Sequence, residues 1–198
     1  MSTDFCTSKT KTNLMRSFAG ETQAHMRYIF AKQTCTQQKH HSLAALFNFT
    51  AMQEKEHAEV FYNYLKQCNG ETIEFSADYP INESTDICKL LEEAINNERH
   101  EAEEVYPEFA ETARKEGFGD IANHFENIAT IERSHAERFQ TFLDLMLSEK
   151  LYASAETERW VCLNCGYILE STSAPEQCPV CNAEQGYYIR LSMSSWGI

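Results

Sequence analysis

Glu132-Arg133-Ser134-His135 is the stretch that decides the fold, because it places a carboxylate and an imidazole three residues apart. The same E-x-x-H pattern occurs earlier, as Glu54-Lys55-Glu56-His57. On a helix, residues i and i+3 share a face, so each stretch points both side chains in one direction. Two such pairs, with one carboxylate from each of two further helices, make a two-metal site inside a four-helix bundle.

The length, charge and hydropathy of the chain exclude several classes of protein and of binding partner. The chain has 198 residues and a formal net charge of −13, which argues against nucleic acid or an anionic membrane as its main partner. No run approaches the roughly 20 apolar residues that a membrane helix needs. Residues 1–18 are polar and lack the apolar segment of a secretory signal. We therefore expect a cytoplasmic protein, in which the scattered cysteines are thiols at least partly buried.

The first half of the chain predicts two helices. The first is expected to be capped by Ser8 or Thr10, to run through the high thirties and to carry Glu21 on its apolar face. The second covers roughly residues 42–67. The long connection over residues 69–83 favours a crossover between parallel helices. We expect the apolar positions of both helices to be buried: Leu14, Phe18, Met26, Ile29, Leu43, Leu46, Phe47, Phe49, Met52, Phe61 and Leu65.

The third helix should open within residues 82–85 and extend to about Glu116. Pro107 lies inside it and cannot donate a hydrogen bond to the carbonyl of Glu103, so a kink is expected there. The alternative is a helix that ends near Tyr106 and restarts.

A short turn at Gly117-Phe118-Gly119 makes the fourth helix antiparallel to the third. We expect Asp120 to cap this helix, which continues to about Leu147.

The two halves resemble each other. Glu21 precedes Glu54 by 33 residues, and Glu98 precedes Glu132 by 34, which indicates a pseudo-twofold repeat. The candidate metal ligands are the acids and histidines on the predicted inner faces: Glu21, Glu54, His57, Glu98, Glu101, Glu132 and His135. Carboxylates with one imidazole per metal suit iron or manganese, and Glu54 and Glu132 are the expected bridges. Alternatively, these side chains line solvated helix faces.

Composition changes after about Lys150, so we expect a bundle domain over residues 1–150 and a small β module over residues 156–198. Residues 152–158 are expected to be a linker, and short β-like pieces follow at residues 160–161 and 187–191. About forty residues bury too little for a core of their own, so a metal must organise the module.

Two C-x-x-C pairs supply the ligands of that metal: Cys162, Cys165, Cys178 and Cys181. Four thiolates fit zinc or a single iron, and a redox disulfide is the weaker alternative. Gly166 and Asn182 follow the two pairs, where positive φ is expected.

In order along the chain, these motifs resemble the rubrerythrin family. The matching residues are Phe18-Ala19-Gly20-Glu21, Glu54-Lys55-Glu56-His57-Ala58, Glu98-Arg99-His100-Glu101 with Tyr106-Pro107, Glu132-Arg133-Ser134-His135, Trp160-Val161-Cys162-Leu163-Asn164-Cys165-Gly166-Tyr167 and Ala174-Pro175-Glu176-Gln177-Cys178-Pro179-Val180-Cys181. The resemblance implies a mainly α fold, with a ferritin-like diiron bundle followed by a rubredoxin-like module. It also implies two non-haem irons in the bundle and one iron among the four cysteines.

The expected function is a peroxidase that reduces hydrogen peroxide to water and protects against oxidative stress. The resemblance implies a homodimer and electrons that enter through the four-cysteine iron from an unidentified donor protein. It also implies that Glu101 and His57 exchange as ligands on reduction, and that Tyr28 and Tyr106 line the diiron pocket, although both tyrosines also fit a simple core role. The alternatives are a ferritin-like ferroxidase that stores iron, and a zinc ribbon in place of the four-cysteine iron.

Overall fold

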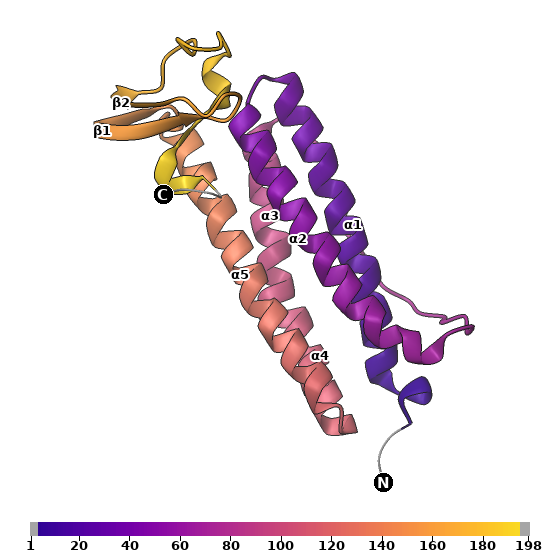
Figure 1. The fold of residues 1–198 in the computed structure, drawn as a ribbon. Coiled ribbons are helices and arrows are strands. Elements are labelled where there is room, and N and C mark those ends of the chain that lie inside the picture. Colours follow the sequence, from indigo (N-terminus) through magenta and orange to yellow (C-terminus); the bar gives the residue numbers. More distant parts are fainter. Residues whose placement is uncertain (1–3, 195–198) are drawn as a thin grey trace.

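The chain forms a long helical bundle with a small β module at one end (Figure 1). The structure is a computed structural model that describes residues 4–194. The outer ends of the two expected domains, residues 1–3 and 195–198, lie outside the described residues. The helices of the bundle are α1 (Lys9–Gln37), α2 (His41–Leu65), α3 (Ile87–His100), α4 (Tyr106–Glu116) and α5 (Gly119–Leu147).

The connection between α2 and α3 is the predicted crossover. Residues 69–86 contain no regular helix or strand and return along α1, so that α2 and α3 run parallel (Figure 1). Tyr79 fixes this connection to α1, because its hydroxyl donates to the carbonyl of Arg16 at 2.6 Å. Its ring lies so close to Gly20 that a Cβ there would meet Tyr79 Cε1 at 3.3 Å.

The ends of the helices follow from their capping residues. Ser8 caps α1 as predicted, and its hydroxyl accepts from the amide of Lys11 at 3.0 Å. The expected start of the third helix within residues 82–85 is wrong, because Asp86 accepts from the first amides of α3. The prediction that Asp120 caps the last helix is also wrong. Helix α5 begins at Gly119, after Gly117 has reversed the chain at a φ of +93°.

Between α3 and α4 the chain stays helical but widens into a π-helix, Glu101–Val105. The amide of Tyr106 donates to the carbonyl of Glu101, five residues back. This wide turn stands immediately before Pro107, whose missing amide we expected to cause a kink or an interruption. The structure therefore shows one extra residue accommodated inside a continuous helix, rather than a helix that ends near Tyr106 and restarts.

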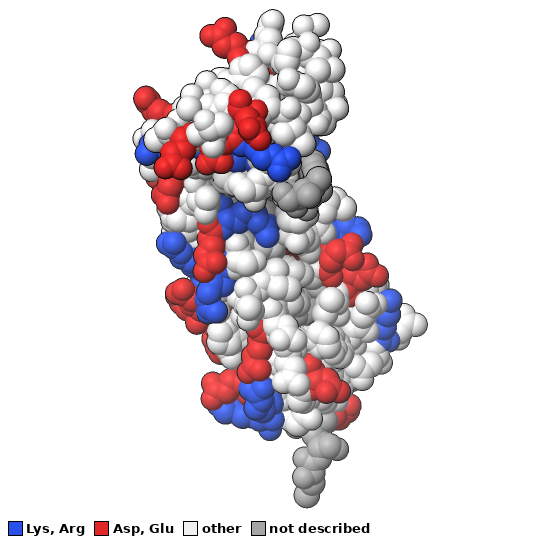
Figure 2. Space-filling model, turned by 60° about the vertical axis from the view of Figure 1, so that its left-hand side comes forward, with Lys and Arg blue, Asp and Glu red and all other residues white. Residues whose placement is uncertain are grey.

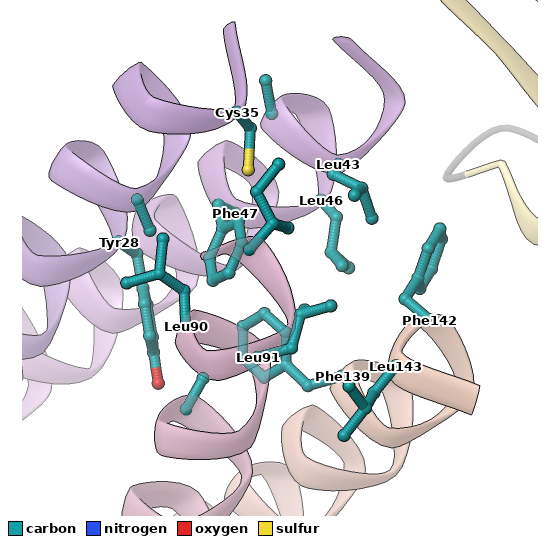
Figure 3. Close-up of a cluster of buried hydrophobic side chains, with 14 of the residues drawn as sticks. Tyr28, Cys35, Leu43, Leu46, Phe47, Leu90, Leu91, Phe139, Phe142 and Leu143 are labelled. Carbon is teal, nitrogen blue, oxygen red and sulfur yellow. The ribbon is translucent and has the colours of Figure 1, made fainter. Parts of the chain in front are cut away.

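Buried apolar side chains from α1, α2, α3 and α5 pack together in one cluster (Figure 3). Tyr28, Phe47 and Phe139 lie with their ring centroids 5.2–6.0 Å apart. The expectation that Met26, Phe49 and Met52 are buried is wrong, since all three are exposed.

The module is a three-stranded antiparallel sheet in the order β2-β1-β3. Its strands are β1 (Ala153–Cys162), β2 (Ile168–Ser173) and β3 (Tyr188–Arg190). The predicted linker over residues 152–158 is wrong, because β1 already begins at Ala153 and continues without a break into the first cysteine pair. Trp160 forms the centre of the module and donates from its indole nitrogen to the carbonyl of Ser171 at 3.0 Å.

The module sits on the turn between α1 and α2. The ring of Tyr187 stacks on His41 with a centroid separation of 3.7 Å. Gly186 touches the backbone of this turn so closely that a Cβ would lie 1.7 Å from the carbonyl oxygen of Lys39. Val161, Ile189 and Leu191 of the module share one apolar core with the bundle, which joins the two parts.

Charged side chains of both signs are spread over the surface (Figure 2). On the face shown, basic and acidic residues alternate along the bundle. Ion pairs on the surface of the bundle include Arg114 with Glu126 at 2.8 Å and Lys115 with Glu111 at 2.6 Å. Among residues 4–194, no helix is long and apolar enough to cross a membrane.

Candidate metal centres

Six of the seven predicted ligands of the bundle meet in its interior, and all six are buried. They form two overlapping groups whose ligand atoms lie within 4.8 Å of one another: Glu21, Glu54, His57 and Glu132 in one, and Glu54, Glu98, Glu132 and His135 in the other. Each group contains three carboxylates and one imidazole. Such a donor set suits iron or manganese.

Glu54 and Glu132 belong to both groups, and each turns one oxygen toward each histidine. Glu132 Oε1 lies 2.9 Å from His57 Nδ1, and its Oε2 lies 2.8 Å from His135 Nδ1. Glu54 repeats this arrangement, with Oε2 3.4 Å from His57 Nδ1 and Oε1 2.9 Å from His135 Nδ1. This geometry is the one that two bridging carboxylates between a pair of metal ions require.

The atoms that face the centre are the ones without hydrogen-bond partners: Glu21 Oε2, both oxygens of Glu54, His57 Nδ1, Glu98 Oε2, both oxygens of Glu132 and His135 Nδ1. Buried polar atoms are normally satisfied, and so many converging exceptions fit cations as their partners. The residues present therefore fit a two-metal centre.

The two terminal glutamates are each held by a tyrosine. Tyr28 of α1 donates to Glu98 Oε1, and Tyr106 of α4 donates to Glu21 Oε1. In both carboxylates the second oxygen is the one left free to face the centre. Tyr28 follows Glu21 by seven residues and Tyr106 follows Glu98 by eight. The extra residue of the π-helix thus brings the two tyrosines into equivalent positions.

Burial and crowding change the protonation of this cluster. Burial disfavours a charged His135, but the carboxylates of Glu132, Glu54 and Glu98 offset this and raise its pKa to about 12. Burial and the neighbouring Glu54 raise the pKa of Glu98 to about 8. A metal ion that binds here must therefore displace protons, which couples its affinity to pH.

Glu101, the seventh predicted ligand, lies beside the two groups and belongs to neither. Its pKa is raised well above the usual range by burial and by the nearby carboxylates of Glu21 and Glu98. Together with Tyr106 and Tyr79 it lines a cavity of about 390 Å³ between the crossover connection and α1. Glu101 is thus placed between the cluster and a space that a small substrate can enter.

The sequence did not indicate that Gln53 holds the ring of His135 in place. The Nε2 of this ring lies 3.1 Å from Gln53 Oε1, and Arg138 donates to the same oxygen at 3.1 Å. Because arginine only donates, the amide oxygen must face both groups, and His135 must carry its proton on Nε2. The Nδ1 lone pair is then free to bind a metal. Gln53 directly precedes Glu54, but nothing in its spacing distinguishes it from a surface residue.

His25, four residues after Glu21 on α1, belongs to neither group. Its Nδ1 contacts the carbonyl of Ala51 at 2.6 Å.

The second centre lies in the module, where the four predicted cysteines come together within 4.8 Å. Cys162 Sγ is 3.8 Å from Cys181 Sγ, and Cys165 Sγ is 3.7 Å from Cys178 Sγ. Gly166 and Asn182 have φ values of +79° and +59°, as predicted for the residues that close the two turns.

Amide groups favour the thiolate form in the module. The Asn164 amide lies 3.4 Å from Cys181 Sγ and lowers the pKa of that thiol. Four sulfur ligands around one point fit a single iron or zinc ion.

Comparison with known proteins decides the family. The rubrerythrin family model matches residues 12–143, and the model of the rubredoxin-like domain of rubrerythrin matches residues 160–189. The rubrerythrin of Clostridium perfringens (strain 13 / Type A) is 39% identical over 182 residues, which cover 91% of this chain and 93% of that one. The chain belongs to the rubrerythrin family. Its cofactors are therefore two irons in the bundle and one iron among the four cysteines, and the donor sets fit all three.

Other rubrerythrin relatives agree with this placement. The rubrerythrin of Nitratidesulfovibrio vulgaris is 34% identical over 187 residues, with coverage of 94% and 96%. The solved structure of fully reduced, all-ferrous nigerythrin superposes with a TM-score of 0.62 at 26% identity, and covers 93% of this chain and 90% of that one. Bacterioferritin of Mycobacterium tuberculosis shares the fold, with a TM-score of 0.63 at 18% identity over 75% of this chain and 91% of that one. The rubrerythrin family and the two centres support an oxidoreductase role in oxidative stress.

Proposed function

We propose that this protein is a peroxidase that reduces hydrogen peroxide to water with electrons that enter through the four-cysteine iron. The observation that carries the proposal is the presence in one chain of a paired carboxylate–histidine centre and a four-thiol centre. Iron storage would need only the first of them. Iron held in the bundle supplies the two electrons that cleave the O–O bond.

The protein's own groups hold the ligands and move the proton. Tyr28 and Tyr106 fix Glu98 and Glu21 by hydrogen bonds, so that each presents its free oxygen to the centre. Burial and the neighbouring carboxylates raise the pKa of Glu101 well above its usual range, which favours its protonated form. From the wall of the cavity it can donate that proton to the departing hydroxide, which leaves as water.

We assign Glu54 and Glu132 as shared ligands, His57 and Glu21 as ligands of one iron, and His135 and Glu98 as ligands of the other. In this proposal Glu101 would take the place of His57 as a ligand when the protein is oxidised. The donor of electrons is a reduced redox protein, and the compartment is the cytoplasm.

Electrons are proposed to cross between two copies of the chain. Glu54 lies thirteen residues into α2, whose first residue is next to the module. At 1.5 Å per residue, the two centres of one chain are separated by about 20 Å or more. In a homodimer, the module of one copy can lie closer to the bundle centre of the other.

The first experiment uses iron-loaded protein, reduced anaerobically and then mixed with hydrogen peroxide. We expect the visible thiolate-to-iron bands to return rapidly and peroxide to be consumed. A colourless module that contains zinc, or reoxidation no faster with peroxide than with air, would overturn the proposal. Release of stored iron as the main outcome would favour a ferroxidase instead.

A mixing experiment separates the two electron routes. Cys165→Ser removes a ligand of the module, and Glu132→Ala removes a shared ligand of the bundle, so that each variant alone is expected to be inactive. If electrons cross between copies, refolding a mixture of both variants restores part of the activity. If the mixture remains as inactive as its components, the route between copies is excluded.

A further inference from the structure

Two of the cysteines outside the module are not isolated. Cys6 belongs to the short 3-10 helix Phe5–Thr7 that precedes α1, and Cys68 ends the 3-10 helix Lys66–Cys68 that follows α2. The sulfurs of both residues and a carboxylate oxygen of Glu71 lie within 4.8 Å of one another. These residues are at the opposite end of the bundle from the module (Figure 1).

We propose that Cys6 and Cys68 form a reversible disulfide when the protein meets hydrogen peroxide. The thiolate of Cys6, which is half-exposed, attacks one peroxide oxygen, the O–O bond breaks, and hydroxide leaves and is protonated to water. Cys68 then attacks the sulfur of the resulting Cys6 sulfenic acid, so that the S–S bond forms and the S–O bond breaks. The second oxygen leaves as water with the Cys68 proton. Overall, two thiols lose two electrons and one peroxide gains them.

The environment assigns the two sulfurs different roles. Cys68 is only 5% exposed, and its pKa is raised to about 11 by burial, by Cys6 and by Glu71. It therefore stays protonated at neutral pH, and its proton must be removed as it attacks in the second step, because the thiolate is the nucleophile. A carboxylate oxygen of Glu71 lies within 4.8 Å of both sulfurs, a separation that one water molecule can bridge, and we assign it as the acceptor of that proton.

The same three groups are less suited to a metal. Structural zinc takes four sulfur or nitrogen ligands, and among residues 4–194 this cluster offers two sulfurs and one carboxylate. A disulfide needs only the two sulfurs to approach to about 2 Å. The cross-link would close the loop of residues 7–67 and hold the start of α1 to the end of α2, which restricts the unfolded chain.

The test uses iron-loaded, oxidised protein without a reductant, in the Cys88→Ser background. This change leaves Cys68 as the only cysteine in the peptide from residue 67 to Lys89, because trypsin cuts after Lys66 and Lys89. After peroxide treatment and alkylation, we expect that peptide to be linked to residues 1–9 and to be released by dithiothreitol. The melting temperature of the intact, cross-linked protein should rise. The proposal would be overturned if both thiols were still alkylated after peroxide treatment, or if a bound zinc ion were what protected them.

Two variants check the roles. In Cys6→Ser, oxidation of Cys68 should become much slower, and an unchanged rate would show that the two do not act together. Glu71→Gln should leave the formation of the Cys6 sulfenic acid unchanged but slow the cross-link severalfold, so that a dimedone probe traps more of the sulfenic acid. Equal cross-linking rates in Glu71→Gln and in the protein that keeps Glu71 would exclude this residue as the proton acceptor. Circular dichroism of each variant shows whether it is folded.

Discussion

Glu132 is the residue on which both groups of the bundle centre depend, because each of its oxygens faces a different histidine. We expect Glu132→Ala to lose iron from both positions and Glu21→Ala to lose it mainly from one. Metal analysis, with the iron of the module as an internal standard, distinguishes these outcomes. The exposed Glu137 on the same helix provides the control, since Glu137→Ala should keep all three irons. Loss of a single iron from Glu132→Ala would contradict the shared role.

Gln53 breaks the pseudo-symmetry of the centre. It directly precedes Glu54 and supports His135, whereas the corresponding residue before Glu132 is Ile131, which cannot accept a hydrogen bond. Among the described residues, no side chain hydrogen-bonds to Nε2 of His57. One imidazole is therefore fixed by a neighbour and the other is not, which agrees with the proposed exchange at His57.

Making the halves alike tests this difference. Gln53→Ile should weaken metal binding at the His135 position by about 10- to 100-fold, as is typical when the partner of a ligating histidine is lost. Titration of the metal-free protein with ferrous iron measures the change. Ile131→Gln is the matched variant and should not weaken either position. Equal affinity in Gln53→Ile would show that Arg138 and the surrounding packing suffice to orient the ring.

At the scale of elements, the π-helix Glu101–Val105 sets the register between α3 and α4. Deleting the exposed Glu103 should convert it to an ordinary α-helix, in which each residue turns about 100°. Either Glu98 or Tyr106 then points away from the centre. We expect a helical protein by circular dichroism that holds less iron in the bundle. Full iron content would show that the extra residue has no part in building the site.

Glu116 joins the end of α4 to the start of α1. Its carboxylate accepts from the amides of Lys9 and Thr10, at 3.0 and 2.8 Å, and from the Thr10 hydroxyl at 2.6 Å. Partial burial raises the pKa of Glu116, but the hydrogen bonds from Thr10 and Lys9 outweigh it and hold the pKa below the usual value of 4.5. A group whose pKa is lowered in the folded state adds stability above its unfolded pKa, and this is lost as the pH falls through the folded value.

Glu116→Gln should therefore destabilise the protein by about 1–2 kcal/mol at pH 7. The difference from the parent protein should begin to shrink as the pH falls below about 4.5, where Glu116 of the unfolded chain takes up a proton, and should be lost once the pH passes below the lowered pKa of the folded protein. Melting temperatures at several pH values measure this effect. Glu111→Gln, on the exposed surface of the same helix, serves as the control. A difference that persists undiminished at low pH would show that the charge of Glu116 is not what matters.

For the whole molecule, Gly186 fixes how the module sits on the bundle. A Cβ at this position would lie 1.7 Å from the carbonyl oxygen of Lys39, and backbone cannot yield as a flexible side chain does. Gly186→Ala should therefore displace the module while both parts keep their metals. We expect unchanged visible bands, slower electron delivery to the bundle and faster proteolysis between residues 150 and 160. Gly119→Ala, where a Cβ meets nothing within 4 Å, is the control.

Features that depend on a short, fixed spacing along the chain could be predicted from the sequence. The E-x-x-H pairs, the cysteine turns and even the positive φ of Asn182 depend on contacts a few residues apart. Features that arise from distant contacts were not predictable. Phe49 is exposed beneath Arg138, which lies 5.1 Å from its ring. The π-helix adds a residue that Pro107 does not indicate, since a proline predicts only a kink or an interruption. Glu98 could be selected over its neighbours only because the two halves match.

The crossover connection divides the bundle into two hairpins, α1–α2 and α3–α5, joined by residues 69–86. Each metal group draws three ligands from one hairpin and a single glutamate from the other, Glu132 for the first group and Glu54 for the second. Neither hairpin can complete a group alone. Iron bound in the bundle therefore links the two hairpins to each other. If the chain were cut within the crossover, binding of both ions would show that the two fragments had associated.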